Sequence, residues 1–346
     1  MDFSNYLIFW YLKNRRDLPW RKTNNPYYIW LSEVILQQTR IAQGTSYYFK
    51  FVESFPTIFD LANADEDTVL KLWQGLGYYT RARNLHHTAK FVVDHYNGEF
   101  PSNYEDLIKL KGIGEYTAAA ISSICFKEPH ATVDGNVYRV LSRYFNIDIP
   151  INSTNGIKHF KQLAQSLIDI KNPGDHNQAI MELGAMTCTP KNFKCNSCPL
   201  NQSCLALKYK NITSLPVKDK KVKIKKRFFN FLVFDISDNY TLLEKRTNKD
   251  IWQNLYQFPL YESVHQINFN ELIKTNIMKT FTKNNHYNLQ AFNKKPIIHK
   301  LTHQHIYTIF WIIKTEAHYN DVVKWENVST FAVPTLIHNF INKFKK

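Results

Sequence analysis

The sequence predicts a mainly α-helical domain followed by a smaller α+β domain, and three observations support this fold class. Apolar residues recur at intervals of three and four, with frequent capping residues, up to about Lys210. The basic run KDKKVKIKKR then extends from Lys218 to Arg227. After it the pattern changes to alternating segments rich in β-branched and aromatic residues. We therefore expect a helical domain at 1–210, a basic linker at 211–227 and an α+β domain at 228–346.

Composition narrows the class of partner. The 346 residues carry a formal net charge of +15, which suits a polyanion, although a lysine-rich composition can also serve solubility alone. Hydrophobic residues make up 44% of the chain, enough for two packed cores. No stretch approaches the roughly 18 apolar residues that a membrane span requires. We expect a soluble, cytoplasmic protein that does not bind membranes.

A helical hairpin is predicted near residue 110. Ser102 with Glu105 resembles a capping box that starts one helix, and a second helix follows as EYTAAAISSI. Between them stands Gly112-Ile113-Gly114, a turn whose backbone N–H groups can bind phosphate beside a helix N-terminus. Such a turn is also common in helix packing alone, so phosphate binding depends on its context.

Two carboxylates are candidates for catalysis. Glu33 is the only charged residue between Tyr27 and Leu36, so it is either a desolvated, protonated acid or part of a polar stripe beside Ser32 and Gln37. Asp134 precedes the helical pattern VYRVLSRYF, where it can cap the helix or stabilise a cation. Glycosidic cleavage commonly uses one carboxyl group as acid and another to stabilise the sugar cation.

Four cysteines with the spacing C-x6-C-x2-C-x5-C predict a metal centre: Cys188, Cys195, Cys198 and Cys204. Four thiolates hold either an iron–sulfur cluster or zinc, and only one of the two short knuckles usual for zinc is present. Unligated core cysteines and disulfides are weaker alternatives. The remaining Cys125 is expected to be a small core residue of an apolar helix.

The second domain begins with the predicted strands FFNFLVFDI and YTLLEKR, joined by a turn at Ser237-Asp238-Asn239. A later strand is expected from His305 to Trp311. His299, His303 and His305 lie close together near it, and a metal site there is an open alternative to contact with solvent or DNA.

Taken together, these motifs resemble the MutY-type adenine DNA glycosylases of the helix-hairpin-helix, iron–sulfur glycosylase superfamily. The resemblance covers the whole first domain. Its motifs are LPWR (from Leu18), SEVILQQT (from Ser32), WQGLGYYTRARNL (from Trp73), LKGIGEYTA (from Leu110), VDGNV (from Val133), NQAIMELGA (from Asn177) and the cysteine run. It implies a [4Fe–4S] cluster on the four cysteines.

The resemblance also implies roles for the catalytic residues. Glu33 is expected to protonate adenine at N7 and then to activate water. Asp134 is expected to stabilise the oxocarbenium ion, with Tyr116 and Asn136 as its hydrogen-bonding companions. Tyr116 stands where related lyases of the endonuclease III type carry a nucleophilic lysine, so the resemblance implies a monofunctional enzyme that leaves an abasic site.

The DNA-binding residues follow in the same way. Leu18, Trp20 and Gln178 are expected to form part of the pocket that receives the extruded adenine, whose reactive atoms are out of reach inside the stack. Gln38 and Tyr78 are expected to fill the gap left in the duplex, with core packing as the alternative for Tyr78. The residues implied in binding DNA or the base are Leu18, Trp20, Arg21, Gln38, Tyr78, Gly112, Gly114, Gln178, Thr302 and His303.

The second domain resembles the family's Nudix-like domain through IWQNLYQFP, which begins at Ile251. The glutamate-rich metal box of Nudix hydrolases does not follow it, so we expect a domain that binds 8-oxoguanine rather than a hydrolase. Leu301-Thr302-His303 takes the place of the family's frequent Phe-Ser-His, with leucine unable to stack as phenylalanine does.

The expected partner is double-stranded DNA with adenine opposite 8-oxoguanine or guanine, bound by a monomer that is nucleoid-associated during base excision repair. A lyase acting on oxidised pyrimidines, a non-catalytic lesion binder and a nucleotide hydrolase are the alternative functions.

Overall fold

The computed structural model describes residues 3–219, 224–282 and 286–344. Contacts divide the chain into two compact units: residues 1–64 with 83–220, and residues 65–82 with 221–346. Part of the predicted basic linker, residues 220–223, lies outside the described residues. Strand β1 begins at Lys225, so the last three residues of that segment belong to a strand.

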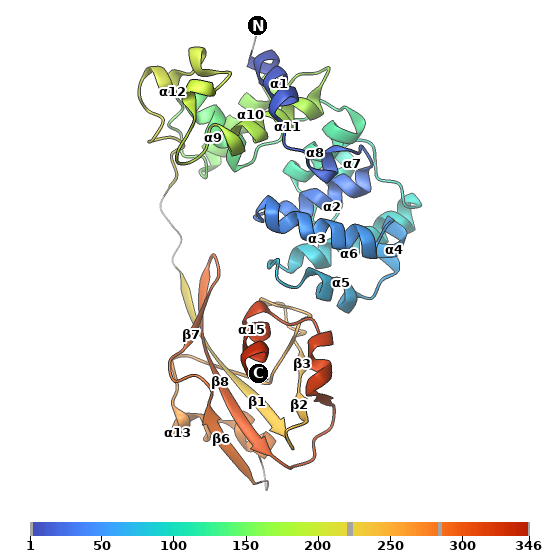
Figure 1. Cartoon of the computed structure of the whole chain (residues 1–346), viewed down its shortest axis with the longest axis vertical. Coiled ribbons are helices and arrows are strands. Elements are labelled where there is room, and N and C mark those ends of the chain that lie inside the picture. Colours follow the sequence, from blue (N-terminus) through green and yellow to red (C-terminus); the bar gives the residue numbers. More distant parts are fainter. Residues whose placement is uncertain (1–2, 220–223, 283–285, 345–346) are drawn as a thin grey trace. The chain divides into compact units, whose positions relative to one another are not determined.

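The first unit is helical throughout its described part (Figure 1). Its helices are α1 (Phe3–Asn14), α2 (Pro26–Leu36), α3 (Ile41–Ser54), α4 (Ile58–Asn63), α7 (Tyr104–Leu107), α8 (Glu115–Phe126), α9 (Gly135–Tyr144), α10 (Thr154–Leu167), α11 (Pro173–Met186) and α12 (Leu205–Lys208), with most of α6 (Thr80–Tyr96) and the short 3₁₀ helices η1 (Pro19–Arg21), η2 (Cys195–Ser197) and η3 (Asn201–Ser203).

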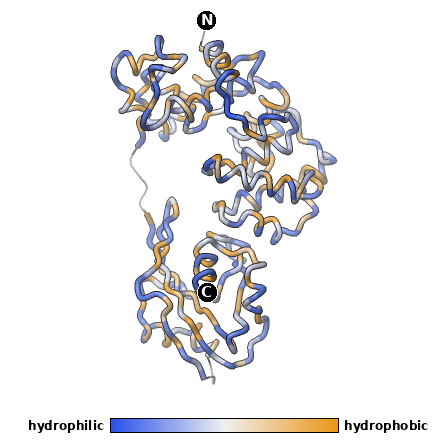
Figure 2. The backbone as a smooth tube through the Cα atoms, viewed as in Figure 1, coloured by the Kyte–Doolittle hydropathy of each residue, from blue (hydrophilic) through white to orange (hydrophobic). Residues whose placement is uncertain are grey.

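The core of this unit forms where α1, α9, α10 and α11 pack together. Leu7, Leu141 and Phe160 are fully buried there, and Ile180 and Leu183 of α11 complete the cluster. Hydrophobic and hydrophilic positions are interspersed along the backbone of this unit (Figure 2), and the hydrophobic ones of these four helices gather in this cluster. This packing fixes α11, the helix that carries the candidate site residue Gln178.

The hairpin at residues 104–126 confirms the predicted helix–turn–helix, with one correction. Helix α7 is capped by Asn103, whose side chain accepts from the backbone N–H of Asp106; the capping box predicted for Ser102 and Glu105 is wrong. The helix begins one residue later than predicted, with Asn103 rather than Ser102 as its N-cap. Serine and asparagine are both strong N-cap residues, so the sequence does not separate the two positions.

The second unit is built around a long parallel pair, β1 (Lys225–Ile236) and β8 (Gln304–Thr315), whose register runs from Lys225↔Gln304 to Ile236↔Thr315. The sheet continues with β2 (Tyr240–Leu242), β5 (Leu260–Ser263), β6 (Tyr287–Ala291), β7 (Ile297–Lys300) and β9 (Val322–Lys324), while β3 (Glu244–Lys245) and β4 (Tyr256–Gln257) pair separately.

Both faces of the central pair are covered. Phe310 stacks on Phe340 of α15 (Thr335–Phe344), with ring centroids 4.1 Å apart. On the opposite face, Phe234 and Trp311 pack with residues of α13 (Phe269–Leu272) and α14 (Asn276–Thr282). The predicted strands are thus confirmed. Because successive side chains of β1 and β8 point to opposite faces and both faces are covered, these strands are apolar at nearly every position.

Residues 65–82, which include α5 (Glu66–Trp73), pack with the C-terminal strands. Asp67 accepts hydrogen bonds from Lys245 (2.6 Å) and from the Tyr256 hydroxyl (3.0 Å). Lys71 donates to the carbonyl of Phe331, near the 3₁₀ helix η4 (Trp325–Thr330). No helix among the described residues is long and apolar enough to cross a membrane.

Candidate active site

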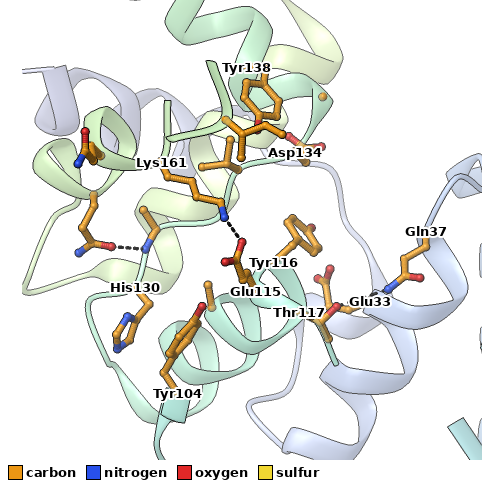
Figure 3. A pocket seen from close by; sticks show the side chains of 18 of the residues that line it. Glu33, Gln37, Tyr104, Glu115, Tyr116, Thr117, His130, Asp134, Tyr138 and Lys161 are labelled. Carbon is orange, nitrogen blue, oxygen red and sulfur yellow. Dashed lines mark hydrogen bonds and ion pairs between the residues drawn. The ribbon is translucent and has the colours of Figure 1, made fainter. Parts of the chain in front are cut away.

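A cavity of about 1,200 Å³ in the first unit collects the candidate catalytic residues, and we call it the catalytic recess (Figure 3). Glu33 reaches it from the end of α2, Tyr116 from the start of α8, and Asp134 from the loop before α9. Gln38 and Gly114 also line it. Sequence segments a hundred residues apart therefore meet at one site.

Glu33 has the electrostatics of an acid rather than those of a surface carboxylate. Burial, together with a smaller effect of the negative charge of Asp134, raises the pKa of its carboxyl group to about 7. Interactions with the Tyr116 hydroxyl and the Arg21 guanidinium oppose this increase. Near neutral pH the group is present in both forms, so it can give a proton and later accept one.

Asp134 is fixed by three hydrogen bonds. As the N-cap of α9 it accepts from the backbone N–H groups of Asn136 (2.9 Å) and Val137 (2.8 Å). The side-chain amide of Asn136 donates to its second oxygen (2.7 Å). Asp134 can therefore cap α9 and stabilise a cation at the same time. The backbone N–H groups that it caps also hold its carboxylate toward the recess.

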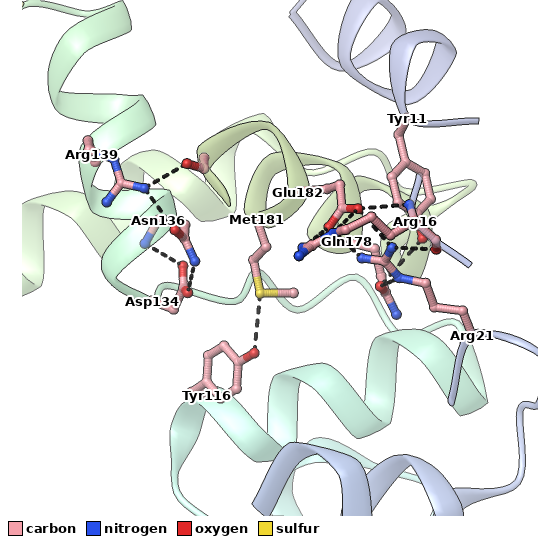
Figure 4. Close-up of polar contacts among 11 residues, drawn as sticks. Tyr11, Arg16, Arg21, Tyr116, Asp134, Asn136, Arg139, Gln178, Met181 and Glu182 are labelled. Atoms are coloured by element: carbon pink, nitrogen blue, oxygen red, sulfur yellow. Dashed lines mark hydrogen bonds and ion pairs between the residues drawn. The ribbon is translucent and has the colours of Figure 1, made fainter. Parts of the chain in front are cut away.

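Tyr116 lines the recess together with Glu33 and Asp134, and both carboxyl groups act on it. Its hydroxyl donates to the Sδ of Met181 on α11 (3.2 Å; Figure 4). Burial and the charges of Glu33 and Asp134 raise the pKa of Tyr116 well above its usual value, so the phenol stays neutral. The described lining of the recess includes one lysine, Lys161, and its ammonium group pairs with the carboxylate of Glu115.

The residues expected to receive the extruded base lie beside a second cavity, of about 310 Å³, lined by Trp20, Arg21 and Gln178 among others. Arg21 donates through Nε to the Gln178 side-chain oxygen (2.9 Å). Leu18 is buried at the start of η1 but does not line either cavity. None of these residues lines the catalytic recess, although the charge of Arg21 acts on Glu33.

Glu182 is a residue that the sequence analysis missed. Its side chain is 1% exposed and forms ion pairs with Arg16 (2.6 Å) and Arg21 (2.9 Å). Burial opposes its ionisation, but the hydrogen bonds from both arginines lower its pKa to about 2. It therefore fixes Arg21. The signal was present in the sequence as a glutamate within the otherwise apolar stretch AIMELGA.

Gln38 and Tyr78 share an unusual backbone conformation. Their φ angles are +55° and +48°, in the left-handed region that side chains with a Cβ rarely adopt. Tyr78, in the second unit, is 52% exposed, which excludes core packing as its role. Strained backbone of this kind is typical of binding sites, where the surrounding structure maintains it.

Thr302 and His303 form the exposed tip of the β7–β8 hairpin, closed by a hydrogen bond from the N–H of Leu301 to the carbonyl of Gln304. The Thr302 hydroxyl lies 2.7 Å from the Tyr78 hydroxyl. Two residues predicted separately to contact DNA are therefore neighbours. His299 instead packs its ring against Trp252 (5.6 Å).

The glycines of the hairpin differ in what they require. Gly112 has a φ of +82°, and a Cβ there would lie 2.6 Å from Cβ of Asn84. Gly114 has an ordinary φ of −91° and open space around it, at the N-terminus of α8. Gly112 is thus needed for the turn, whereas Gly114 leaves room for a ligand.

Cys188, Cys195, Cys198 and Cys204 line one cavity, and Arg143 donates to the Sγ of Cys188 (3.4 Å). Among the described residues, no three His, Cys, Asp or Glu side chains are placed to hold a single metal ion. Zinc would draw all four sulfurs to about 2.3 Å from one ion, whereas a cluster binds each thiolate at a different iron. Four thiolates around one cavity can hold an iron–sulfur cluster, whereas the ring of His299 packs on Trp252.

Comparison with known proteins identifies two domain families and a set of close relatives. The model of the HhH-GPD superfamily of base excision DNA repair proteins matches residues 31–169, and that of the NUDIX domain matches residues 231–343. The chain is 38% identical over 304 residues to an adenine DNA glycosylase of Buchnera aphidicola subsp. Schizaphis graminum, covering 87% of this chain and 84% of that one. A second such enzyme, of Buchnera aphidicola subsp. Baizongia pistaciae, is 36% identical over 99% of this chain and 97% of its own.

The chain belongs to the adenine DNA glycosylase family. It is therefore an enzyme that hydrolyses N-glycosyl bonds. The rat adenine DNA glycosylase is 46% identical over 213 residues, or 59% of this chain and 41% of that protein.

Solved structures agree on the fold. A thermostable thymine-DNA glycosylase matches 60% of this chain and 95% of its own, at 29% identity and a TM-score of 0.55. A trapped endonuclease III–DNA intermediate matches 60% of this chain and 94% of its own, at 22% identity and a TM-score of 0.52. The predicted fold class, a helical glycosylase domain followed by a Nudix-like domain, is confirmed.

Proposed function

We propose that this glycosylase is monofunctional and excises adenine opposite 8-oxoguanine or guanine. The observation that carries the proposal is the pairing, across one recess, of a carboxyl group with a pKa of about 7 and a carboxylate held by three hydrogen bonds. An acid and a cation stabiliser are what N-glycosidic cleavage through an oxocarbenium-like state requires. The protein would act as a cytoplasmic monomer that associates with the nucleoid during repair.

In this mechanism Glu33 donates its proton to N7 of the extruded adenine, which makes the base a better leaving group. The bond from C1′ to N9 breaks, and the electron pair leaves with the base. Asp134, oriented by Asn136, faces the cation that develops on the sugar. Glu33, now a carboxylate, takes a proton from the water that adds to C1′.

The chain offers little for lyase chemistry. A lyase needs an amine that attacks C1′, and Tyr116 presents a neutral phenol next to Glu33. Lys161 lines the recess but is held by Glu115 on α8. We therefore expect an abasic site as product, with the strand intact until alkali is added.

DNA binding is assigned to surfaces of both units. Gly112 and Gly114 would present backbone N–H groups to phosphate, and Gln38 would fill the gap left by the adenine. In the second unit, Thr302 with His303 would contact the 8-oxoguanine, and Tyr78, hydrogen-bonded to Thr302, would stack beside it. A leucine at position 301 removes one aromatic contact from this hairpin.

Cys188, Cys195, Cys198 and Cys204 would hold a [4Fe–4S] cluster. The cluster would order the loop that contains them, and Arg143 would balance part of its negative charge.

The test is single-turnover cleavage of duplexes that carry adenine opposite 8-oxoguanine, guanine or thymine, with and without alkali. The proposal expects breaks only after alkali, fastest opposite 8-oxoguanine. Breaks without alkali would assign the chain to the lyases, and binding of all three duplexes without cleavage of any would make it a lesion binder.

A further inference from the structure

The charges that line the catalytic recess differ in sign from the net charge of the chain. The described lining includes three carboxyl groups, those of Glu33, Glu115 and Asp134, and one lysine, Lys161. The whole chain, in contrast, carries a net charge of +15. A DNA strand that reaches this recess therefore meets mainly acidic groups, and Lys161 is the cation of the described lining that can offset them.

Lys161 and Glu115 come from different helices and meet at the recess. Lys161 extends from α10, Glu115 belongs to the first turn of α8, and their ammonium and carboxylate groups form an ion pair (Figure 3). The two side chains are 43% and 58% exposed, respectively, so water reaches both. An ion pair this exposed contributes little to stability. Its two groups can therefore separate when a ligand enters the recess.

The pair lies beside the hairpin turn to which phosphate binding is assigned above. Glu115 directly follows Gly114, the N-cap of α8, where an added Cβ would meet open space. Because the ammonium group of Lys161 contacts the carboxylate of Glu115, it lies within the length of one glutamate side chain of this turn. A phosphate at the turn would be repelled by Glu115 and attracted by Lys161.

We propose that Lys161 is a DNA-binding residue that leaves Glu115 for a backbone phosphate of the bound strand, and that Glu115 weakens DNA binding by competing for it. The inference rests on the proposed function and adds one residue to its DNA contacts. An ammonium group on a flexible four-carbon chain can turn from one anion to a neighbouring one. Because a phosphate contact carries no sequence information, it should change the affinity for every duplex alike.

The test is the salt dependence of DNA affinity, measured by fluorescence anisotropy with the whole chain and a duplex that carries a tetrahydrofuran abasic analogue opposite 8-oxoguanine. Each phosphate contact steepens the fall of log Kobs with log salt by about 0.9. Between about 50 and 200 mM KCl, the affinity of the wild type should therefore fall about 3.5-fold more than that of Lys161→Gln. A fall of equal size in the two proteins would overturn the proposal.

The matched control is Lys158→Gln. It removes an exposed lysine from the same helix, α10, but Lys158 is not among the residues that line the recess. Both variants reduce the net charge by one, so a general effect of charge would be the same in each. We expect Lys158→Gln to keep the wild-type salt dependence, and a slope reduced as much as that of Lys161→Gln would contradict a specific contact.

A change on the other side of the ion pair separates competition from a structural role. Glu115→Gln releases Lys161 and removes a negative charge from the turn, so it should lower the dissociation constant by about two- to fivefold, the range set by the strength of an exposed ion pair. If the pair served only to join α8 to α10, its loss from either side would have the same effect. Unchanged or weaker binding by Glu115→Gln would therefore contradict the competition.

The two proposals fail separately. Absence of cleavage on every duplex would refute the proposed function, whereas the anisotropy titrations require no cleavage and decide the role of Lys161 by themselves.

Discussion

Replacing Glu33 with glutamine should abolish cleavage and also stabilise the protein, increasingly so at higher pH. The pKa of this carboxyl group is about 7 in the folded chain, against 4.5 as its ordinary value. A raised pKa means that the folded state binds the proton more tightly than the unfolded state. Stability contributed by the group is therefore complete below pH 4.5 and is lost as the pH rises towards 7.

The size of the effect follows from the two pKa values. A shift of about 2.5 units corresponds to about 3 kcal/mol, lost in full by pH 8. At pH 5.5 only about 1.4 kcal/mol of it is lost, by the same relation. Because glutamine does not ionise, Glu33→Gln should gain about 2 kcal/mol more relative to the wild type at pH 8 than at pH 5.5.

The assay is urea denaturation at pH 5.5 and pH 8, followed by circular dichroism at 222 nm, which reports mainly on the helical unit. The matched control is Glu53→Gln, which removes an exposed carboxyl group from α3 and should leave the urea midpoint unchanged at both pH values. A Glu33→Gln gain that is equal at the two pH values would refute the argument that burial sets the protonation of Glu33.

Three further predictions concern other parts of the site. Asp134→Asn should keep duplex binding and the cap of α9, because asparagine also caps helices, while single-turnover cleavage falls by at least about a hundredfold; near-normal turnover would remove Asp134 from the mechanism. Cys198→Ser should lose the visible absorption of an iron–sulfur cluster together with DNA affinity, and unchanged affinity in gel-shift titrations of cluster-free protein would break that link. Gly112→Ala should destabilise the protein by about 1–3 kcal/mol and weaken binding to every duplex alike, because its φ is +82° and Asn84 stands in the way, whereas Gly114→Ala should retain wild-type stability in the same urea titration.

Much of this account follows from local sequence. Asp134 before an amphipathic pattern predicts an N-cap, and the structure has one there. Alternating apolar segments predict β1 and β8, and both are present. These signals are local because a cap or a strand depends on neighbours a few residues away. The wrong capping box at Ser102 shows the limit, since two adjacent residues can both serve as caps.

Contacts between distant segments were not predictable in this way. The ion pair of Arg16 with Glu182 joins residues 166 apart, and the Tyr78–Thr302 hydrogen bond joins residues 224 apart. The ionisation of Glu33 was also undecided, because the sequence shows apolar neighbours but not which side of α2 faces the recess. Packing of α2 against α8 decides it, because it places Glu33 in the recess with its carboxyl group largely shielded from water.

The central claim is that Glu33 drives the excision of adenine, and the most direct measurement is free adenine released in a single turnover. Wild-type protein and Glu33→Gln would be mixed in excess with a duplex carrying adenine opposite 8-oxoguanine at pH 7, and the base quantified by chromatography. The account predicts one adenine per duplex from the wild type and none above background from the variant, with duplex binding retained by both. Release of adenine by Glu33→Gln at the wild-type rate would contradict it.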